Sequence, residues 1–418
     1  MKLRDLNWIP AGLALLLGSI TCAALLLLLS GGASPGQAAP PPMELHVCPS
    51  GCPYNSIQTA VDAADPGAII KVAAGTYTDT HTRGGVTQVV YLAKTVNIIG
   101  GFTTTNWHQP DPIRNVTRID AGGQGRGLYI TGYYDPVISG LHITGGDATG
   151  LGGDPWGNDA GGGIYINVTP VTIRSCVIYG NTAYRGGGLF SNAMGMNLLG
   201  NLFRENSADW GGGLYLYSGN ATVADNLIIA NQATTRYGGG LYINGGTPVL
   251  VNNVLRDNHV QAVDAAGSGL FIYRAEPRLV HNTVAANTGG LGVGIYIDDT
   301  GSQFSSVVMT NTIIYSHVIG LEIEENNSVN LAGTLWYANS VYNWSGAGTI
   351  SHSNNVFQDP KLAPDGYHLL PGSGAIDAGV AAGLLPDIDG QLRPLGTGYD
   401  IGADEYFLYY VQLPLLQR

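Results

Sequence analysis

The chain has 418 residues, of which 62 are glycine, 44% are hydrophobic and only 11% are charged. With a net charge of −12 and only 18 lysines and arginines, the chain lacks the excess of basic residues expected of a nucleic-acid-binding protein. A chain of this length can bury a large core, and so much glycine indicates many tight turns.

The N-terminus has the features of an export signal. Lys2 and Arg4 precede an apolar run over 11–29, and small residues follow as far as Ala39. This order predicts a secretory signal peptide over 1–38, cleaved near Ala38. The apolar run is also close to the length that spans a bilayer, so a retained membrane anchor is the alternative. We therefore expect a secreted or cell-surface protein.

Residues 39–134 predict the beginning of a stacked fold. Apolar side chains fall at helical spacing within 54–64, and Asp65-Pro66-Gly67 ends that helix. Residues 68–72 then read as a strand. A short amphipathic helix at the open end of a stack covers the apolar side chains that the first coil exposes, so we expect it to act as a cap.

The cysteines indicate one covalent link. Cys48 and Cys52 are separated by three residues, and a short disulfide between them fits an exported chain. Two cysteines without a second pair make a poor zinc site. Cys176 falls within the repeats and is expected to be a small buried side chain.

The repeats over 135–350 are the most informative part of the chain. A glycine-rich bend and a short strand recur at steps of 25, 25, 27, 29 and 25 residues, starting at Gly161, Gly186, Gly211, Gly238, Gly267 and Gly292. A period in this range indicates stacked units, none of which can bury its apolar face alone. Short strands between Gly and Asn turns predict an all-β parallel β-helix solenoid.

An asparagine recurs before one of the strands of each repeat. The column consists of Asn201, Asn226, Asn253, Asn282 and Asn311. Equivalent residues of a parallel stack lie about 4.8 Å apart, so that amides can bond from coil to coil. A buried amide without a partner costs about 1–3 kcal/mol, whereas stacked amides satisfy one another. We interpret the column as structural and not as a set of metal ligands.

These features resemble the right-handed parallel β-helix superfamily of pectate-lyase-like proteins. The opening over 56–77 is similar to the N-terminal cap of that superfamily, and Phe203-Arg204-Glu205-Asn206 looks like the repeat of polymorphic outer-membrane proteins. Residues 374–405 resemble a terminal domain of exported bacterial β-helix proteins with varied anchors. The resemblance implies a right-handed parallel β-helix but no single activity, because the superfamily holds lyases, hydrolases, adhesins and non-enzymes.

The same resemblance implies that 351–418 is a C-terminal cap or anchor-associated segment. Its end, Tyr406 to Arg418, is apolar and aromatic. It reads either as a last strand on the stack or as a short surface-attachment signal, and we favour the strand.

Aligning the coils on the last glycine of each bend predicts an outward aromatic ladder. Its members are Tyr165, Phe190, Tyr215, Tyr242, Phe271 and Tyr296. Aromatic faces suit sugar rings, which makes Tyr215, Tyr242, Phe271 and Tyr296 candidate ligand-binding residues. The alternative, which we favour, is that the rings stack on one another or lie under a loop. Stacking contributes about 0.5–1.5 kcal/mol per pair beyond burial.

The ladder passes into an acidic patch at its C-terminal end. The patch holds Asp298, Asp299, Glu322, Glu324 and Glu325. Like charges this close repel unless solvent, a cation or a raised pKa relieves them, and oxygen ligands of this kind suit calcium. The five are therefore candidate calcium ligands. A surface ion pair between Arg274 and Asp299 is the simpler relief, and we favour it.

Two further patterns carry less information. The loop over 145–159 is rich in Gly and Asp, contains Trp156 and is longer than the equivalent bends; it reads as a metal or ligand loop or, in preference, as an insertion. The histidines are scattered without metal spacing, and no nucleophile–base motif appears.

The favoured function is that of a secreted or surface-displayed, non-catalytic β-helix protein in adhesion or carbohydrate binding. One alternative is a calcium-dependent polysaccharide lyase acting on uronate-containing glycans, with Arg274 as the candidate base. A polygalacturonase-like hydrolase is rejected, because only Asp298-Asp299 matches its sequence blocks. The other alternative is a structural envelope protein. The expected partner is a polysaccharide or cell-surface glycan, with no nucleic acid, and with membrane contact only through an uncleaved N-terminal segment.

Overall fold

The computed structural model describes residues 41–407, with the exception of 168–169, 300, 302 and 384–385. The chain divides into two units, Met1–Pro42 and Met43–Arg418, and every described helix and strand belongs to the second. The predicted signal peptide and most of the predicted final strand lie outside the described residues. No helix in the described part of the chain is long and apolar enough to cross a bilayer.

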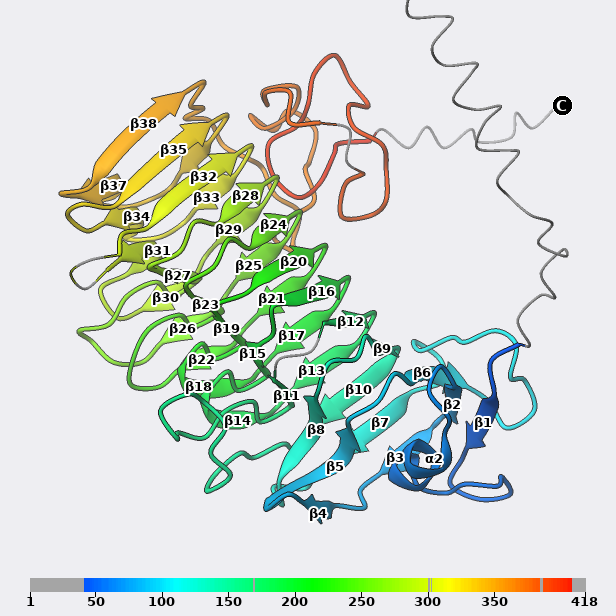
Figure 1. The fold of residues 1–418 in the computed structure, drawn as a ribbon. Helices are drawn as coiled ribbons and strands as arrows, with labels where there is room; N and C mark the ends of the chain where they lie inside the picture. Colours follow the sequence, from blue (N-terminus) through cyan, green and yellow to red (C-terminus); the bar gives the residue numbers. More distant parts are fainter. Residues whose placement is uncertain (1–40, 168–169, 300, 302, 384–385, 408–418) are drawn as a thin grey trace, which may run out of the picture. The chain divides into compact units, whose positions relative to one another are not determined.

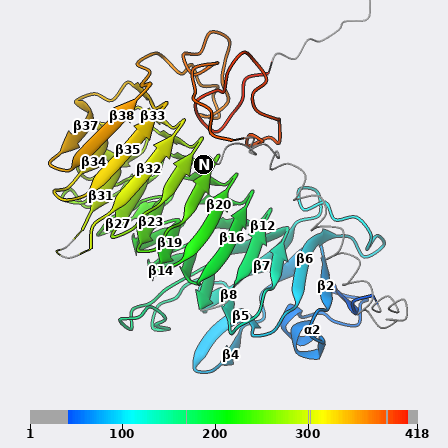
Figure 2. The ribbon, with the colours of Figure 1, turned by 45° about the horizontal axis from the view of Figure 1, so that its top comes forward.

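The second unit is a parallel β-helix (Figure 1), in which each coil adds strands to the same few sheets. The strands within a sheet are therefore not consecutive in sequence. The named strand pairs are parallel, except that β4 runs antiparallel to β5 at the N-terminal edge. Figure 2 shows β12, β16 and β20 side by side within one sheet.

Four sheets make up the coils. Sheet 1 has 12 strands, in the order β1 (Glu44–Val47), β2 (Ile69–Ala73), β6 (Asn97–Phe102), β9 (Val137–Ser139), β12 (Val171–Arg174), β16 (Gly195–Leu199), β20 (Asn220–Ala224), β24 (Val249–Val251), β28 (Arg278–Val280), β32 (Ser306–Thr310), β35 (Ser328–Ala332) and β38 (Thr349–Ser353). Sheet 2 has 10 strands, in the order β3 (Gly75–Tyr77), β7 (Thr117–Asp120), β10 (Leu141–Thr144), β13 (Val177–Tyr179), β17 (Leu202–Arg204), β21 (Leu227–Ile229), β25 (Val254–Arg256), β29 (Thr283–Ala285), β33 (Ile313–Tyr315) and β36 (Leu335–Tyr337).

The remaining two sheets carry the candidate site. Sheet 3 has 11 strands, in the order β37 (Tyr342–Gly346), β34 (Ile319–Ile323), β31 (Val293–Asp298), β27 (Leu270–Tyr273), β23 (Leu241–Asn244), β19 (Leu214–Tyr217), β15 (Leu189–Asn192), β11 (Ile164–Asn167), β8 (Arg126–Thr131), β5 (Val86–Leu92) and β4 (His81–Arg83). Sheet 4 has five strands, β14 (Thr182–Arg185), β18 (Ser207–Trp210), β22 (Gln232–Ala233), β26 (His259–Val260) and β30 (Thr288–Gly289).

The register places equivalent residues directly above one another. On sheet 3, Leu214 pairs with Leu189 and Leu241, and the next residue, Tyr215, pairs with Phe190 and Tyr242. Because side chains alternate along a strand, the leucines point into the core while the aromatic rings lie on the other face of the sheet. The leucines are fully buried in the main hydrophobic core.

Buried asparagine ladders link the coils, as predicted. The Nδ2 of Asn201 donates to Oδ1 of Asn226, that of Asn226 to Asn253, and that of Asn253 to Asn282, each at 3.0 Å. A second ladder runs through Asn181, Asn206, Asn231, Asn258 and Asn287.

The prediction for Asn311 is wrong by one position. Thr283 pairs with Ile313, so the residue that lies above Asn282 is Thr312. Asn311 lies above His281 instead, with its Nδ2 3.3 Å from the His281 Nε2. The sequence Asn311-Thr312-Ile313 resembles the corresponding residues of the earlier repeats. The register of this coil is set instead by the packing of Ile313 and Ile314.

The helix expected near the N-terminus is α2, Ile57–Ala63, with Ser56 at its N-cap. Gln58 fixes it to the first full strand of sheet 3, because its Oε1 accepts from the Tyr91 backbone N–H at 2.6 Å. Cys48 and Cys52 form a disulfide just before it, and Cys176 is a free, buried cysteine.

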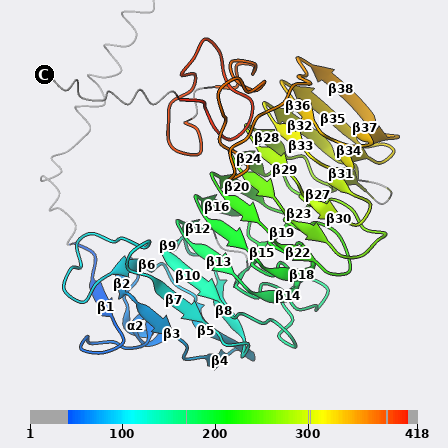
Figure 3. The same cartoon turned by 180° about the vertical axis from the view of Figure 1, so that it is seen from behind.

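Residues 354–407, here called the C-terminal segment, follow the last strand and contain no helix or strand in their described part. The segment lies beside β24 and β28 (Figures 1 and 3). Asn311 exchanges two hydrogen bonds with the backbone of Val380, at 2.7 and 2.8 Å, and the Ala403 N–H donates to Thr283 Oγ1 at 3.1 Å.

Candidate functional site

The aromatic ladder is a continuous stack of rings. Tyr215 and Tyr242 lie 4.7 Å apart between ring centroids, Tyr242 and Phe271 4.9 Å, and Phe271 and Tyr296 5.4 Å, all nearly parallel. Tyr215, Tyr242 and Phe271 are only 1%, 3% and 1% exposed. Their faces are therefore occupied by one another, and the hypothesis of an open sugar platform on these rings is wrong. Tyr296 is partly exposed, and its hydroxyl donates to Glu324.

The loop over 145–159 is fastened to the N-terminal half of the ladder. Asp154, whose side chain is completely buried, forms an ion pair with Arg185 of β14. The Tyr165 hydroxyl donates to the Gly153 carbonyl at 2.6 Å. Arg126 donates to the carbonyls of Gly152 and Ala160, at 2.5 and 2.8 Å. The loop thus has charged and neutral anchors on three coils.

Asp154 also shapes the tip of this loop. Its Oδ1 accepts from the backbone N–H groups of Trp156, at 2.9 Å, and Asn158, at 2.6 Å. An aspartate that bonds the backbone two residues ahead is the usual device for closing a tight turn. The turn holds out Trp156, which is 55% exposed although its ring edge contacts Tyr217 at a centroid distance of 5.3 Å.

A pocket of about 310 Å³ opens between this loop, sheet 4 and the ladder. Its walls combine indole and phenol rings with a cation, an amide and a carboxylate. The lining residues are Trp156, Arg185, Trp210, Tyr215, Tyr237, Tyr242, Asn244, Phe271, Tyr273 and Asp298. Three rings of the ladder, Tyr215, Tyr242 and Phe271, are thus part of the lining.

Arg185 is the charged centre of the pocket. Its guanidinium lies 4.2 Å from the Trp156 ring centroid and 5.5 to 5.6 Å from those of Tyr215 and Trp210. Because Asp154 already neutralises the charge, the guanidinium presents its donors without adding strong net charge to the pocket. This arrangement suits a polar, uncharged ligand better than an anion.

Further polar groups also line the pocket. The Nδ2 of Asn244 donates to the Tyr215 hydroxyl at 2.9 Å. Burial, together with the neighbouring carboxylates, raises the pKa of Asp298 above its usual value. An amide, a phenol and a carboxylate beside indole rings are the groups that hold the hydroxyls and the apolar faces of a sugar.

The five side-chain carboxylates of the acidic patch do not converge in a group of three. No three carboxylates among Asp298, Asp299, Glu322, Glu324 and Glu325 bring oxygen atoms within 4.8 Å of one another, as judged on the described residues. Asp299 Oδ2 accepts instead from the Asn327 amide at 2.7 Å. Burial raises the pKa of Glu322, as it does that of Asp298.

The candidate base Arg274 lies next to the pocket and not in its wall. Its guanidinium packs over the ring of Tyr273, 4.9 Å from the centroid. Its backbone N–H donates to the Asp298 carbonyl at 3.3 Å, which ties it to the following coil. In this position the side chain covers a wall residue.

Sequence reasoning missed Arg185, Trp210 and Tyr237 as members of the site, and it considered the loop that contains Trp156 as a ligand loop but favoured an insertion. Trp156 was visible as the single aromatic residue in an unusually long loop. The other three come from sheet 4 and its bends, which the repeat alignment left unassigned. Their meeting with the ladder depends on how each coil bends, and no local pattern reports that bend.

Comparison with known proteins identifies the fold. The family model described as the right-handed β-helix region matches residues 113–304. The fold is thus a right-handed parallel β-helix. No curated protein matches the chain.

Two solved structures are similar to this chain. The pectate lyase Pel9A is 14% identical, with a TM-score of 0.42, over 87% of this chain and 96% of its own. The pectin methylesterase from Aspergillus niger is 16% identical, with a TM-score of 0.31, over 74% of this chain and 88% of its own. At these values neither match bears on the chemistry of the pocket.

Proposed function

We propose that this right-handed β-helix protein binds carbohydrate in the pocket beneath Trp156, as a secreted or cell-surface protein without catalytic activity. The observation that carries the proposal is the exposed indole of Trp156 beside the hydrogen-bonding groups of Arg185, Asn244 and Asp298. An indole stacks on the apolar face of a sugar, while the polar side chains satisfy its hydroxyls.

The size of the pocket sets the scale of the ligand. A volume of about 310 Å³ lies at the lower end of small-molecule sites and accommodates one or two sugar rings. Arg185 is already paired with Asp154, and Asp298 also lines the pocket, so neutral sugars fit better than highly charged ones. We propose a terminal mono- or disaccharide unit of a cell-surface glycan or polysaccharide as the ligand.

A glycan array probed with the purified protein tests this proposal. Trp156→Ala should lower the affinity for the bound glycan by about tenfold or more, because one stacked ring contributes roughly 1.5 kcal/mol. Trp156 is largely exposed, so the substitution should leave thermal stability nearly unchanged.

Tyr133→Ala is the matched control, because Tyr133 is an exposed aromatic residue on another coil, 85% exposed and outside the pocket. That variant should bind like the wild type. Equal loss in both variants, or full binding by Trp156→Ala, would contradict the proposed site.

The lyase alternative has a direct test in the same preparation. A lyase that acts on uronate-containing glycans would release unsaturated products that absorb in the ultraviolet, and a chelator would stop the reaction if calcium were required. We expect no such products, because the carboxylates proposed for calcium do not converge. A protein that gives neither binding nor products would be left with the structural envelope role.

Two supporting roles belong to the same proposal. Helix α2 caps the first coil, since its buried face, Ile57, Gln58, Ala60 and Val61, would otherwise leave core side chains exposed. The segments 39–134, 135–350 and 351–418 act as the capped start, the repeats and an anchor-associated end of the exported chain.

A further inference from the structure

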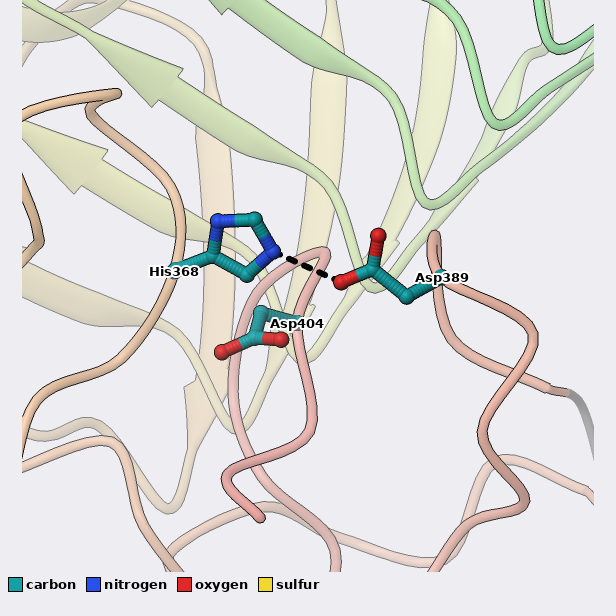
Figure 4. A group of neighbouring side chains, drawn as sticks. All are labelled: His368, Asp389 and Asp404. Atoms are coloured by element: carbon teal, nitrogen blue, oxygen red, sulfur yellow. Dashed lines mark hydrogen bonds and ion pairs between the residues drawn. The ribbon is translucent and has the colours of Figure 1, made fainter. Parts of the chain in front are cut away.

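Three loops of the C-terminal segment bring a histidine and two aspartates together (Figure 4). His368, Asp389 and Asp404 each offer one potential ligand atom, and these atoms all lie within 4.8 Å of one another. The Nε2 of His368 lies 2.6 Å from Oδ2 of Asp389. No other group of three or more such residues occurs in the part of the chain that the structure describes.

The other ring nitrogen of His368 is held by a fourth side chain. Its Nδ1 lies 2.6 Å from Oδ2 of Asp365. Asp365 is itself fixed, because its Oδ1 accepts from the backbone N–H groups of Tyr367 and His368. A carboxylate on Nδ1 keeps the proton there, orients the ring and leaves Nε2 as the electron-pair donor, which is the usual outer support of a metal-binding histidine.

Asp404 supplies a buried carboxylate with an unused oxygen. The residue is only 4% exposed, and its Oδ2 accepts from the Leu369 N–H at 2.7 Å. Among the described residues, Oδ1 has no hydrogen-bond partner. This oxygen is open to solvent in the pocket that Asp404 lines, so it can act as a ligand.

The three side chains lie at a pocket of about 480 Å³. His368, Asp389 and Asp404 line it together with Gln391 and Tyr406. This pocket is separate from the carbohydrate pocket and shares no lining residue with it. It leaves room for water molecules to complete the coordination of an ion.

We propose that His368, Asp389 and Asp404 bind one divalent transition-metal ion, of which zinc is the best fit, with Asp365 as the positioning residue behind His368. One imidazole nitrogen and two carboxylate oxygens suit zinc and its neighbours, whereas calcium and magnesium prefer oxygen alone. The ion would join three loops that otherwise have no regular secondary structure, and would hold the C-terminal segment in its folded form.

The competing explanation is a proton in place of the metal. Burial alone would lower the pKa of His368, but hydrogen bonds to Asp365 and Asp389 raise it above its usual value. An imidazolium between two carboxylates would then tie the loops together without an ion. The two explanations differ in whether the protein takes up zinc at neutral pH.

Calorimetric titration of the tag-free protein with zinc chloride decides between them. The wild type should bind one zinc ion per chain, and both His368→Gln and Asp389→Asn should weaken binding at least about tenfold. Both side chains are more than one-third exposed, so the fold should persist, which circular dichroism would check. Asp365→Asn should weaken binding less than either, because it acts only through the ring orientation.

His81→Gln is the matched control. His81 is also a partly exposed histidine paired with an aspartate, Asp79, but in β4 and without a second carboxylate. Its substitution should leave zinc affinity unchanged. A wild type that binds no zinc, or variants of His368 and Asp389 that bind as the wild type does, would overturn the metal site in favour of the imidazolium.

Discussion

Asn226 shows how much a single amide contributes to the stack. Its Nδ2 donates to Asn253 Oδ1, Leu198 O and Ala224 O, and its Oδ1 accepts from the Asn201 backbone and side chain. Removing it leaves donors and acceptors of both neighbouring coils buried without partners. The ladder is therefore a set of mutually dependent bonds.

Asn226→Ala should lower the free energy of unfolding by about 1–3 kcal/mol or more, since several buried groups lose their partner. Urea denaturation followed by circular dichroism would measure it. Asn197→Ala is the control, because Asn197 is exposed and makes only a 3.4 Å contact with Thr172. Equal free energies of unfolding for the two variants would contradict the stabilising role of the ladder.

His317 follows Asn287 in the second asparagine ladder, with its Nε2 3.2 Å from the Nδ2 of Asn287 and its backbone N–H donating to Asn339 Oδ1 at 3.1 Å. Burial lowers the pKa of His317 from 6.5 to about 4. Between pH 6.5 and about pH 4, this imidazole is protonated in the unfolded chain but stays neutral in the folded chain. The free energy of unfolding therefore decreases as the pH falls from 6.5 towards 4.

His317→Asn removes this titration while keeping an amide in the column. Between pH 7 and pH 4, the wild type should lose on the order of 3 kcal/mol more stability than the variant. Buried acids such as Asp400 are common to both proteins and cancel in the difference. Parallel pH profiles of the unfolding free energy would contradict this assignment.

Residue columns were predictable where the repeat is regular. The asparagines from Asn201 to Asn282 stack as the spacing predicts, because each coil repeats the same local signals. Asn311 was misplaced, since the longer turn after β31 changes the residue count of that coil. A one-residue error in register can be corrected only when it is known which apolar side chains face the core.

At the scale of elements, the loop over 145–159 determines which part of the aromatic ladder is covered. The predicted alternative of an overlying loop holds for the N-terminal half of the ladder, where Tyr165 contacts Gly153. The sequence does not show that the loop folds back, because its anchor Arg185 comes from the following coil. Pairing across coils is a tertiary property.

Asp154→Ala should release this loop, because it leaves Arg185 partly buried without its counter-ion and opens the turn at Trp156. Breaking a buried pair in this way costs about 3–5 kcal/mol. Limited proteolysis should then cut near Trp156, and glycan binding should fall. Glu205→Ala, which breaks the exposed pair with Arg204, should change neither. Resistance of the Asp154 variant to protease would contradict the anchoring role.

At the scale of the molecule, the fold was predictable because every coil repeats its glycine bends, alternating strands and asparagines. The two sites were not. The proposed carbohydrate pocket draws on Trp156, Arg185 and Asp298 from different coils, and the proposed metal site joins residues 368, 389 and 404 across three loops. Each depends on segments that meet only after the chain has folded.

The C-terminal segment also illustrates this limit. Its docking uses Thr283 and Asn311 of the coils, which face Ala403 and Val380. Asn311 thus binds the C-terminal segment, although its position in the repeat predicted a place in the asparagine ladder. A residue type and its spacing indicate a column, but only the fold shows the partner.

A crystal structure of the protein with the glycan that it binds most tightly on the array tests the central claim most directly. We expect a sugar ring stacked on Trp156, with hydroxyls bonded to Arg185, Asn244 or Asp298. A glycan held elsewhere on the coils, with the pocket beneath Trp156 filled only by water, would contradict it.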